Sequence, residues 1–235
     1  MLSTSPIIRT NAADPEQSAP RPVTPRPQLV IFDFDGTLAD TMPWFFGVLN
    51  QVAERHRFRQ ITLAEAEALR HQTSREIVQA LGIRRWRLPF IARDISQRMA
   101  KAAAGGAFGL FPGMADILAS LAATGTVVAI VSSNRESTIR QVLGPSAAHV
   151  THYGCSAALF GKARKFQKIM RHTGLPPRSI LSIGDEVRDI EAARTVGITT
   201  AAVTWGCAGE GALRAASPDV IFHSVAELRC ALIPG

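Results

Sequence analysis

Two aspartates separated by one residue follow a short apolar run near residue 30. They lie in the segment VIFDFDGTLAD, residues 30–40, as Asp33 and Asp35, and Gly36 and Thr37 come directly after them. Side chains two positions apart on an extended chain point to the same side. Carboxylates placed side by side in this way can hold a hard cation. Gly36 favours a tight turn out of the strand.

Other polar side chains also come directly after apolar runs. Ser132, Ser133 and Asn134 follow the run at 126–131, Asp185 and Asp189 follow the run at 179–183, and Lys162 opens a helical pattern between the two runs. Doubly wound sheets bind ligands beyond the carboxyl ends of their strands, so we expect these side chains to lie near Asp33. Several acids beside a lysine and a hydroxyl are typical of a site for Mg²⁺ and phosphate.

Strands and helices must alternate to bring these residues together. The pattern predicts strands at 29–34, 126–131, 179–183, 199–204 and 220–223, and helices at 114–124, 162–172 and 187–196. Short apolar runs rich in β-branched residues that alternate with helical segments are typical of a parallel sheet covered on both faces. The sequence therefore predicts an α/β fold with a Rossmann-like parallel sheet as its core.

The stretch 42–111 interrupts this alternation. It contains no convincing strand, and two capping boxes, Thr62 with Glu65 and Thr73 with Glu76, each open a helical pattern. We expect an all-helical domain at 42–111, inserted into a core domain formed by 29–41 and 112–235. Residues 1–28 are rich in proline and have no periodic apolar face, so we expect a disordered tail there.

Composition narrows the class of protein. The 235 residues are 46% hydrophobic and 19% charged, as in ordinary globular proteins, and no apolar run approaches the roughly 20 residues that a membrane-spanning helix needs. Three cysteines without metal-ligand spacing and the lack of a secretory signal favour reduced thiols and a cytoplasmic location.

The net charge of +7 is concentrated in the helical insert. Residues 42–111 hold ten Arg and one Lys against four Glu and one Asp. Arg75 and the cluster Arg84-Arg85-Trp86-Arg87 are therefore candidates to attract an anionic substrate. A nucleic-acid partner is disfavoured, because only Trp86 supplies an aromatic ring among these arginines.

Four segments taken together resemble the motifs of the haloacid dehalogenase-like (HAD) superfamily. These are DFDGTLAD, VSSN, the Lys162 segment and GDEVRD, in the superfamily's usual order, and the resemblance covers about residues 29–230. The phrases LFPG at 110–113 and DIEAAR at 189–194 are further similar to the phosphoglycolate phosphatase-type branch, which carries a helical cap.

The resemblance implies a role for each site residue. Asp33 would be the nucleophile and Asp35 the general acid and base, while Ser132 and Lys162 would bind the transferring phosphoryl group. The carboxylates of Asp33 and Asp185 and the backbone carbonyl of Asp35 would hold Mg²⁺, with Asp189 as a further ligand or as an orienting group. The implied substrate-binding residues are Gly36, Thr37, Ser133, Asn134 and Arg75. Lys165, one helical turn after Lys162, remains an alternative for the third-motif lysine.

The implied activity is Mg²⁺-dependent hydrolysis of a small phosphorylated metabolite through an aspartyl-phosphate, with a phosphoglycolate-like substrate as a family-level guess. A phosphomutase and a phosphonate hydrolase are the alternatives within the superfamily, although Lys101, the only lysine of the insert, lies near its exit. A non-catalytic module that binds anions or nucleic acid is the alternative outside enzymes. The exact substrate and the oligomeric state stay open.

Overall fold

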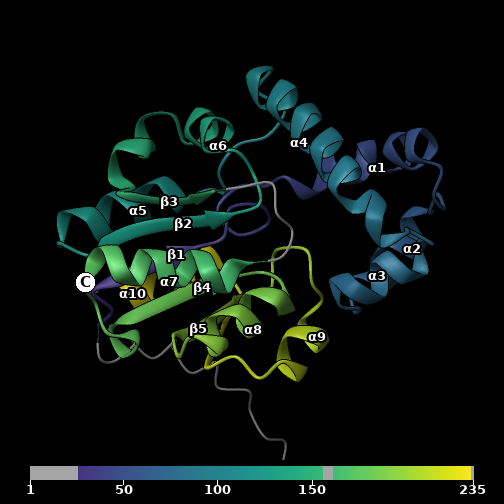
Figure 1. Ribbon diagram of the computed structural model, residues 1–235. Helices are drawn as coiled ribbons and strands as arrows, with labels where there is room; N and C mark the ends of the chain where they lie inside the picture. Colours follow the sequence, from purple (N-terminus) through teal and green to yellow (C-terminus); the bar gives the residue numbers. More distant parts are fainter. Residues whose placement is uncertain (1–25, 156–160, 234–235) are drawn as a thin grey trace, which may run out of the picture.

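The core of the molecule is a parallel sheet of six strands. The computed structural model describes residues 26–155 and 161–233. The strands are β1 (Leu29–Phe32), β2 (Val127–Ser132), β3 (His152–Cys155), β4 (Ile180–Gly184), β5 (Thr199–Val203) and β6 (Val220–Phe222). Their order in the sheet is β3-β2-β1-β4-β5-β6, and every neighbouring pair is parallel (Figure 1). The predicted α/β fold with a Rossmann-like parallel sheet is confirmed.

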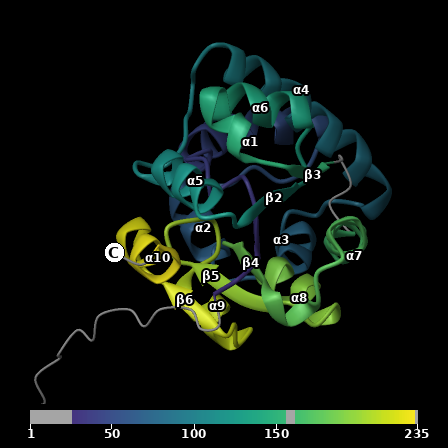
Figure 2. The same cartoon turned by 90° about the vertical axis from the view of Figure 1, so that its left-hand side faces the viewer.

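Helices cover both faces of this sheet. One face packs against α5 (Met114–Ala123), α6 (Glu136–Leu143) and α10 (Val225–Leu232), and the other against α7 (Lys162–Thr173) and α8 (Val187–Thr195) (Figure 2). Alternate residues of β1 serve the two layers, since Val30 and Phe32 belong to the first core cluster and Leu29 and Ile31 to the second. Burial on both faces explains why the strand reads as a continuous apolar run.

Short helices complete the core domain. They are α9 (Glu210–Ala215) and the 3₁₀ turns η2 (Gly144–His149) and η3 (Pro177–Ser179). Leu213 of α9 packs with Ile190 of α8 and Ala202 of β5 in a small separate cluster.

The segment between β1 and α5 is helical, and we call its four helices, residues 42–104, the cap. They are α1 (Met42–His56), α2 (Leu63–Leu69), α3 (Ser74–Ala80) and α4 (Leu88–Ala104), with the 3₁₀ turn η1 (Arg85–Arg87) before α4. Both expected capping boxes form, at Thr62 with Glu65 and at Thr73 with Glu76. The cap has a hydrophobic cluster of its own, centred on Leu49, Ile61 and Leu81.

The structure adds one strand that the sequence pattern did not predict. The strand β3 is only four residues long, is half-buried throughout and pairs with β2 alone within the described part of the chain. Its sequence HYGC lacks the apolar run that marks a central strand. Of the tail predicted at 1–28, residues 1–25 lie outside the described residues. At its end, the backbone N–H of Gln28 donates a hydrogen bond to Ser179 O.

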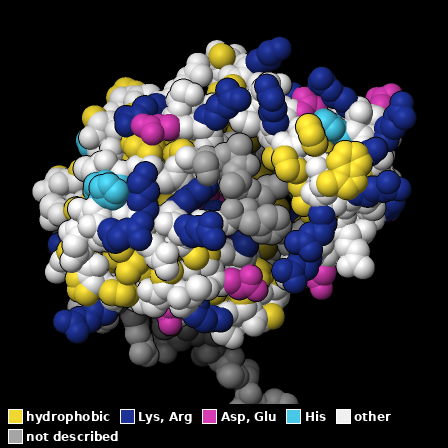
Figure 3. Space-filling model, in the orientation of Figure 1, with side chains coloured by type: hydrophobic (Ala, Val, Ile, Leu, Met, Phe, Trp, Pro, Cys, Tyr) yellow, Lys and Arg dark blue, Asp and Glu magenta, His cyan; other side chains and the backbone are white. Residues whose placement is uncertain are grey.

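Lysine and arginine side chains are prominent over both the cap and the core on the face drawn in Figure 3. Among the described residues, no helix is both long enough and apolar enough to cross a lipid bilayer.

Candidate active site

The parallel register of β2, β1 and β4 brings three strand ends together. Phe32, the last residue of β1, lies opposite Ile130 on one side and Ile183 on the other. The backbone N–H of Asp33 continues the ladder by donating to Ile183 O at 2.8 Å. The residues that follow these strands therefore share one edge of the sheet, next to the point where the strand order reverses between β1 and β4.

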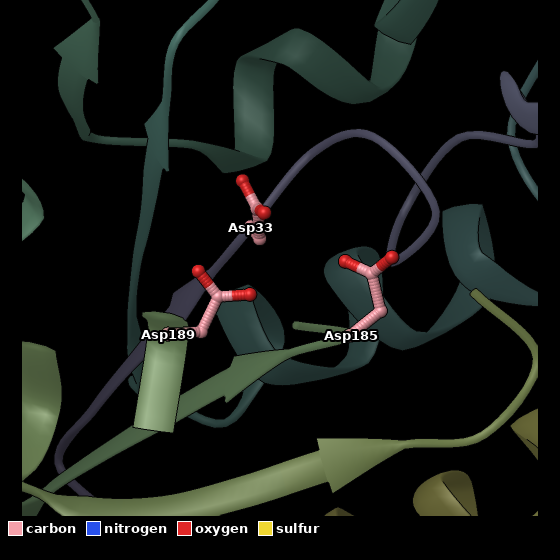
Figure 4. A group of neighbouring side chains, drawn as sticks. All are labelled: Asp33, Asp185 and Asp189. Carbon is pink, nitrogen blue, oxygen red and sulfur yellow. The ribbon is translucent and has the colours of Figure 1, made fainter. Parts of the chain in front are cut away.

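Three buried carboxylates lie at this edge. One oxygen from each of Asp33, Asp185 and Asp189 lies within 4.8 Å of the others, and these residues are only 7%, 1% and 3% exposed. Figure 4 shows them around one space, with Asp33 just beyond β1, Asp185 at the end of β4 and Asp189 in the first turn of α8. Gly184 makes room for Asp189, because a Cβ there would lie 2.4 Å from Asp189 Oδ2.

Lys162 supplies a positive charge to this cluster. Its buried ammonium lies 2.6 Å from Asp33 Oδ2 and also pairs with Asp189. Burial works against the charged form, but the charges of Asp189 and Asp33 outweigh it and raise the Lys162 pKa. Lys165 instead donates to the backbone oxygen of Ser132 at 2.7 Å. Of the two candidate third-motif lysines, Lys162 is thus the one that contacts Asp33.

The cluster carries more negative than positive charge. Burial raises the pKa of Asp185 well above its usual range, and the neighbouring charge of Asp33 raises it further. Burial also raises the pKa of Asp33, against the opposing effect of Lys162. A divalent cation would relieve this repulsion. Carboxylate oxygens are the donors that Mg²⁺ prefers, so the residues present fit that ion.

Asp35 lies beside the cluster in a different environment. Its Oδ2 accepts a hydrogen bond from Asn134 Nδ2 at 2.6 Å, while its buried Oδ1 has no hydrogen-bond partner within the described part of the chain. Burial, followed by the charge of Asp33, raises the pKa of Asp35 to about 7. A carboxyl group with such a pKa can both give and take a proton near neutral pH.

Of the other predicted residues at the strand ends, Thr37 and Asn134 donate hydrogen bonds to carboxylates. Thr37 Oγ1 donates to Asp185 Oδ1 at 3.0 Å. Gly36, at φ +68°, passes so close that a Cβ would lie 2.2 Å from Asp185 Oδ2. Ser132 is fully buried, and its hydroxyl accepts a hydrogen bond from Asn134 N at 3.0 Å. Ser133, next to it, is half-buried.

Arg75 is not among the residues that the structure brings to this cluster. It is exposed in the first turn of α3 and does not line the small cavity between cap and core, whereas Thr73 and Ile77 do.

A different cap arginine reaches the core, and the sequence analysis did not single it out. Arg70 follows α2, and its guanidinium donates to the backbone oxygens of Gly206 and Cys207, both at 2.9 Å. The backbone N–H of Cys207 in turn donates to Asp185 Oδ2 at 2.7 Å. No sequence signal separates Arg70 from the other nine arginines of the cap, because its partners are backbone groups 136 and 137 positions away.

Comparison with known proteins agrees with this geometry. The family model described as haloacid dehalogenase-like hydrolase matches residues 30–203. Phosphoglycolate phosphatase of Synechococcus elongatus is 32% identical over 203 residues, which cover 86% of this chain and 95% of the relative. Tyrosine-protein kinase PtkA of Mycobacterium tuberculosis is 29% identical over 227 residues, 88% of this chain and 72% of the relative.

Solved structures of the family share the fold. A haloacid dehalogenase-like family hydrolase from Streptococcus pneumoniae superposes with a TM-score of 0.67 at 22% identity, covering 85% of this chain and 95% of its own. CbbY from Rhodobacter sphaeroides, solved in complex with phosphate, gives a TM-score of 0.65 at 20% identity, with coverage of 86% and 96%. The chain therefore belongs to the haloacid dehalogenase-like hydrolase family and is a phosphatase of its phosphoglycolate phosphatase-type branch.

Proposed function

We propose that the protein is a Mg²⁺-dependent phosphatase that hydrolyses a small phosphate monoester through a phosphorylated Asp33. The observation that carries this proposal is the buried cluster of Asp33, Asp185 and Asp189 with Lys162 in contact with two of its members. A buried carboxylate can act as a nucleophile toward phosphorus, and a lysine beside it can stabilise negative charge on the phosphoryl oxygens.

Asp33 is the proposed nucleophile. Its Oδ1 accepts a hydrogen bond from Phe34 N at 2.8 Å, and its Oδ2 lies against Lys162, so the carboxylate has one defined orientation. In the first step a carboxylate oxygen of Asp33 bonds to phosphorus, and the bond from phosphorus to the leaving oxygen breaks. Lys162 stabilises negative charge on the phosphoryl oxygens, and we assign Ser132 to the same task.

Asp35 moves the proton in both steps. Protonated Asp35 gives its proton to the leaving oxygen, which departs as an alcohol. Ionised Asp35 then takes a proton from the water that attacks phosphorus, and inorganic phosphate leaves as the Asp33 carboxylate is restored. The Asp35 pKa of about 7 suits both roles at neutral pH, and Asn134 orients the carboxyl group for them.

Asp33, Asp185 and Asp189 would hold Mg²⁺, together with the Asp35 backbone carbonyl. When bound, the ion supplies positive charge that lets an anionic carboxylate approach an anionic phosphate. Thr37 and Cys207 N–H each donate to one oxygen of Asp185 and keep that carboxylate in position.

The proposed substrate is a small phosphorylated metabolite. Phosphoglycolate is the specific compound that the name of the Synechococcus relative suggests. Our proposed substrate-binding residues remain Gly36, Thr37, Ser133, Asn134 and Arg75. The proposed cap domain is residues 42–111. The proposed location is the cytoplasm, in keeping with three free cysteines.

The test is hydrolysis of p-nitrophenyl phosphate by the purified protein with Mg²⁺ and with EDTA. We expect activity with Mg²⁺ alone, and its loss in Asp33→Asn, which keeps the shape of the side chain but not its charge. Activity that persists in Asp33→Asn would refute the assigned nucleophile. A panel of phosphorylated metabolites, with phosphoglycolate and a phosphonate among them, then identifies the substrate class and separates phosphatase from phosphonate hydrolase. Conversion of a sugar phosphate into its isomer would indicate the mutase alternative.

A further inference from the structure

The cap contacts the core through a compact set of hydrogen bonds around Arg70. Nε of Arg70 donates to Cys207 O at 2.9 Å, and Nη2 donates to Gly206 O at 2.9 Å. The backbone adds a third bond, from Gly209 N to Arg70 O at 2.7 Å. The residue at the end of α2 is therefore bound to the loop after β5 by both its side chain and its main chain.

The guanidinium is held in the orientation that these bonds need. Its Nη1 donates to both carboxylate oxygens of Glu67, at 3.1 and 3.2 Å, from the preceding turn of α2. The planar fork of an arginine can serve a carboxylate and two carbonyls at once, which a lysine ammonium on a flexible stem does not match. The His71 ring packs directly against Gly209, where a Cβ would lie 2.6 Å from His71 Nδ1.

One peptide group joins this contact to the acidic cluster. The oxygen of Gly206 and the N–H of Cys207 belong to the same peptide unit, and in a trans peptide they point in opposite directions. The oxygen accepts from Arg70, and the N–H donates to Asp185 Oδ2. A cation, a peptide dipole and a carboxylate thus stand in series, and hydrogen bonds in such a chain polarise and strengthen one another.

The backbone at this peptide packs directly against Asp185. Gly206 is buried, and a Cβ on it would lie 2.2 Å from Asp185 Cβ and 2.5 Å from Gly36 O. The cavity that Arg70 and Cys207 line with Thr73 and Glu186 has a volume of only about 10 Å³, which is room for a single water molecule.

We infer that Arg70 is a positioning residue, which fixes the orientation of Asp185 through the peptide between Gly206 and Cys207 and so couples docking of the cap to completion of the acidic cluster. The inference rests on the proposed phosphatase function for its catalytic consequence. The geometric part, that Arg70 keeps the cap on the loop, does not depend on that function.

The test compares Arg70→Gln with Arg70→Lys and with Arg59→Gln as a matched control. Arg59 is also a cap arginine that pairs with a glutamate, Glu65, and with a backbone oxygen, that of Ala80, but all its partners lie within the cap. Circular dichroism and thermal unfolding establish that each variant is folded.

The first readout is the rate at which a maleimide labels Cys207, resolved by mass spectrometry and measured without Mg²⁺. The Cys207 thiol is half-buried at the contact, whereas Cys230 is exposed and serves as an internal reference. We expect labelling of Cys207 to become about tenfold faster in Arg70→Gln, less so in Arg70→Lys, and to stay unchanged in Arg59→Gln.

The second readout is the Mg²⁺ concentration that gives half-maximal hydrolysis of p-nitrophenyl phosphate. We expect it to rise about tenfold or more in Arg70→Gln, with a lower kcat, partial recovery in Arg70→Lys and no change in Arg59→Gln. A merely structural role would lower thermal stability without moving the Mg²⁺ midpoint.

The two readouts separate failure of the inference from failure of the proposed function. Unchanged Cys207 labelling in Arg70→Gln, or an unchanged Mg²⁺ midpoint in an active enzyme, overturns the inference. A wild-type protein without hydrolytic activity refutes the proposed function, and the labelling rates then still decide whether Arg70 holds the cap.

Discussion

Charge balance governs the candidate site at the level of single residues. Three buried carboxylates lie within one small volume, and Lys162 contacts two of them. An ammonium in this position lowers the cost of keeping Asp33 ionised, and an ionised Asp33 is the form that can attack phosphorus. Lys165, three residues later on α7, is directed to the backbone of β2 instead.

This difference between the two lysines leads to the first prediction. Lys162→Met keeps the unbranched stem of the side chain but removes the terminal ammonium and its charge. We expect kcat for p-nitrophenyl phosphate to fall about 10²- to 10³-fold, as when one electrostatic donor is removed from an active site. Lys165→Met should cost about tenfold or less. A larger loss in Lys165→Met than in Lys162→Met would contradict the assignment, provided that both variants show the circular dichroism of the wild type.

The sequence allowed most of the site residues to be predicted, because strand ends are visible in it. Asp33, Ser132 and Asp185 each follow an apolar run, and parallel strands bring their carboxyl ends to one edge. Arg70 could not be predicted in this way. Its role depends on how the cap lies on the core. Its partners are main-chain oxygens, which every residue has, so no residue type in the sequence marks them.

At the scale of elements, the loop after β5 is as constrained as the strands. Gly206 lies where a Cβ would meet the side chain of Asp185 and the backbone of Gly36, and the latter cannot move aside cheaply. The conformation of this loop therefore requires glycine, which has no side chain, at position 206.

The second prediction compares two Gly→Ala changes. Gly206→Ala should lower the free energy of unfolding by about 1–3 kcal/mol through overpacking and reduce activity by displacing Asp185. Gly211→Ala, in α9, meets open space and should leave activity unchanged, with a gain of up to about 1 kcal/mol from helix propensity. Urea unfolding at pH 7 measures the free energy of unfolding of both variants. Equal stability of the two variants would contradict the proposed close packing at Gly206.

Asp94 connects two helices of the cap and leads to the third prediction. It is buried on α4 and pairs with Arg55 and His56 of α1 and with Arg98 of its own helix. Asp94→Asn should cost about 1–3 kcal/mol of unfolding free energy at pH 7, less than a fully buried pair, because Arg55 is largely exposed.

The pH dependence of this effect has a definite sign. Burial acts to raise the Asp94 pKa, but the hydrogen bond with His56 and the charges of Arg98 and Arg55 outweigh it and hold the pKa below 3.8. The stabilisation by Asp94 is therefore complete above the ordinary pKa and is lost as the pH falls through the lower, folded-state value. The difference between wild type and Asp94→Asn should shrink below about pH 4, where Asp94 becomes protonated. A difference that stays undiminished at about pH 2 would rule out the proposed ion pairs.

The sequence predicted the central strands of the fold better than the edge strand β3, for a physical reason. The strands β1, β2 and β4 are buried on both faces, so nearly every residue in them is apolar and the run is unmistakable. The edge strand β3 is half-buried at all four positions and carries His152 and Gly154, so its membership in the sheet depends on pairing with β2 rather than on its own residues.

At the scale of the whole molecule, the charge is unevenly distributed. The cap carries eleven basic and five acidic side chains, which account for +6 of the net +7. Arg84 lies directly before η1, Arg85 lies on η1 and Arg93 lies on α4, and all three side chains are exposed. A phosphate monoester that approaches the cluster beneath the cap would thus meet an attractive field before it meets Lys162.

The fourth prediction concerns the range of this field. The Debye length falls from about 30 Å at 0.01 M salt to about 10 Å at 0.1 M, so salt screens the exposed arginines but acts much less on the buried pair of Lys162 and Asp33. With MgCl₂ held constant, kcat/KM for a dianionic phosphate ester should fall several-fold as NaCl rises from about 20 to about 300 mM, which is roughly the range over which screening sets in. The value of kcat should stay nearly constant. Replacing Arg84, Arg85 and Arg93 together by Gln should lower kcat/KM at low salt and flatten the salt dependence. If wild type and triple variant respond equally to salt, the cap does not attract the substrate through these charges, and the excess of arginine serves only the solvated faces of its helices.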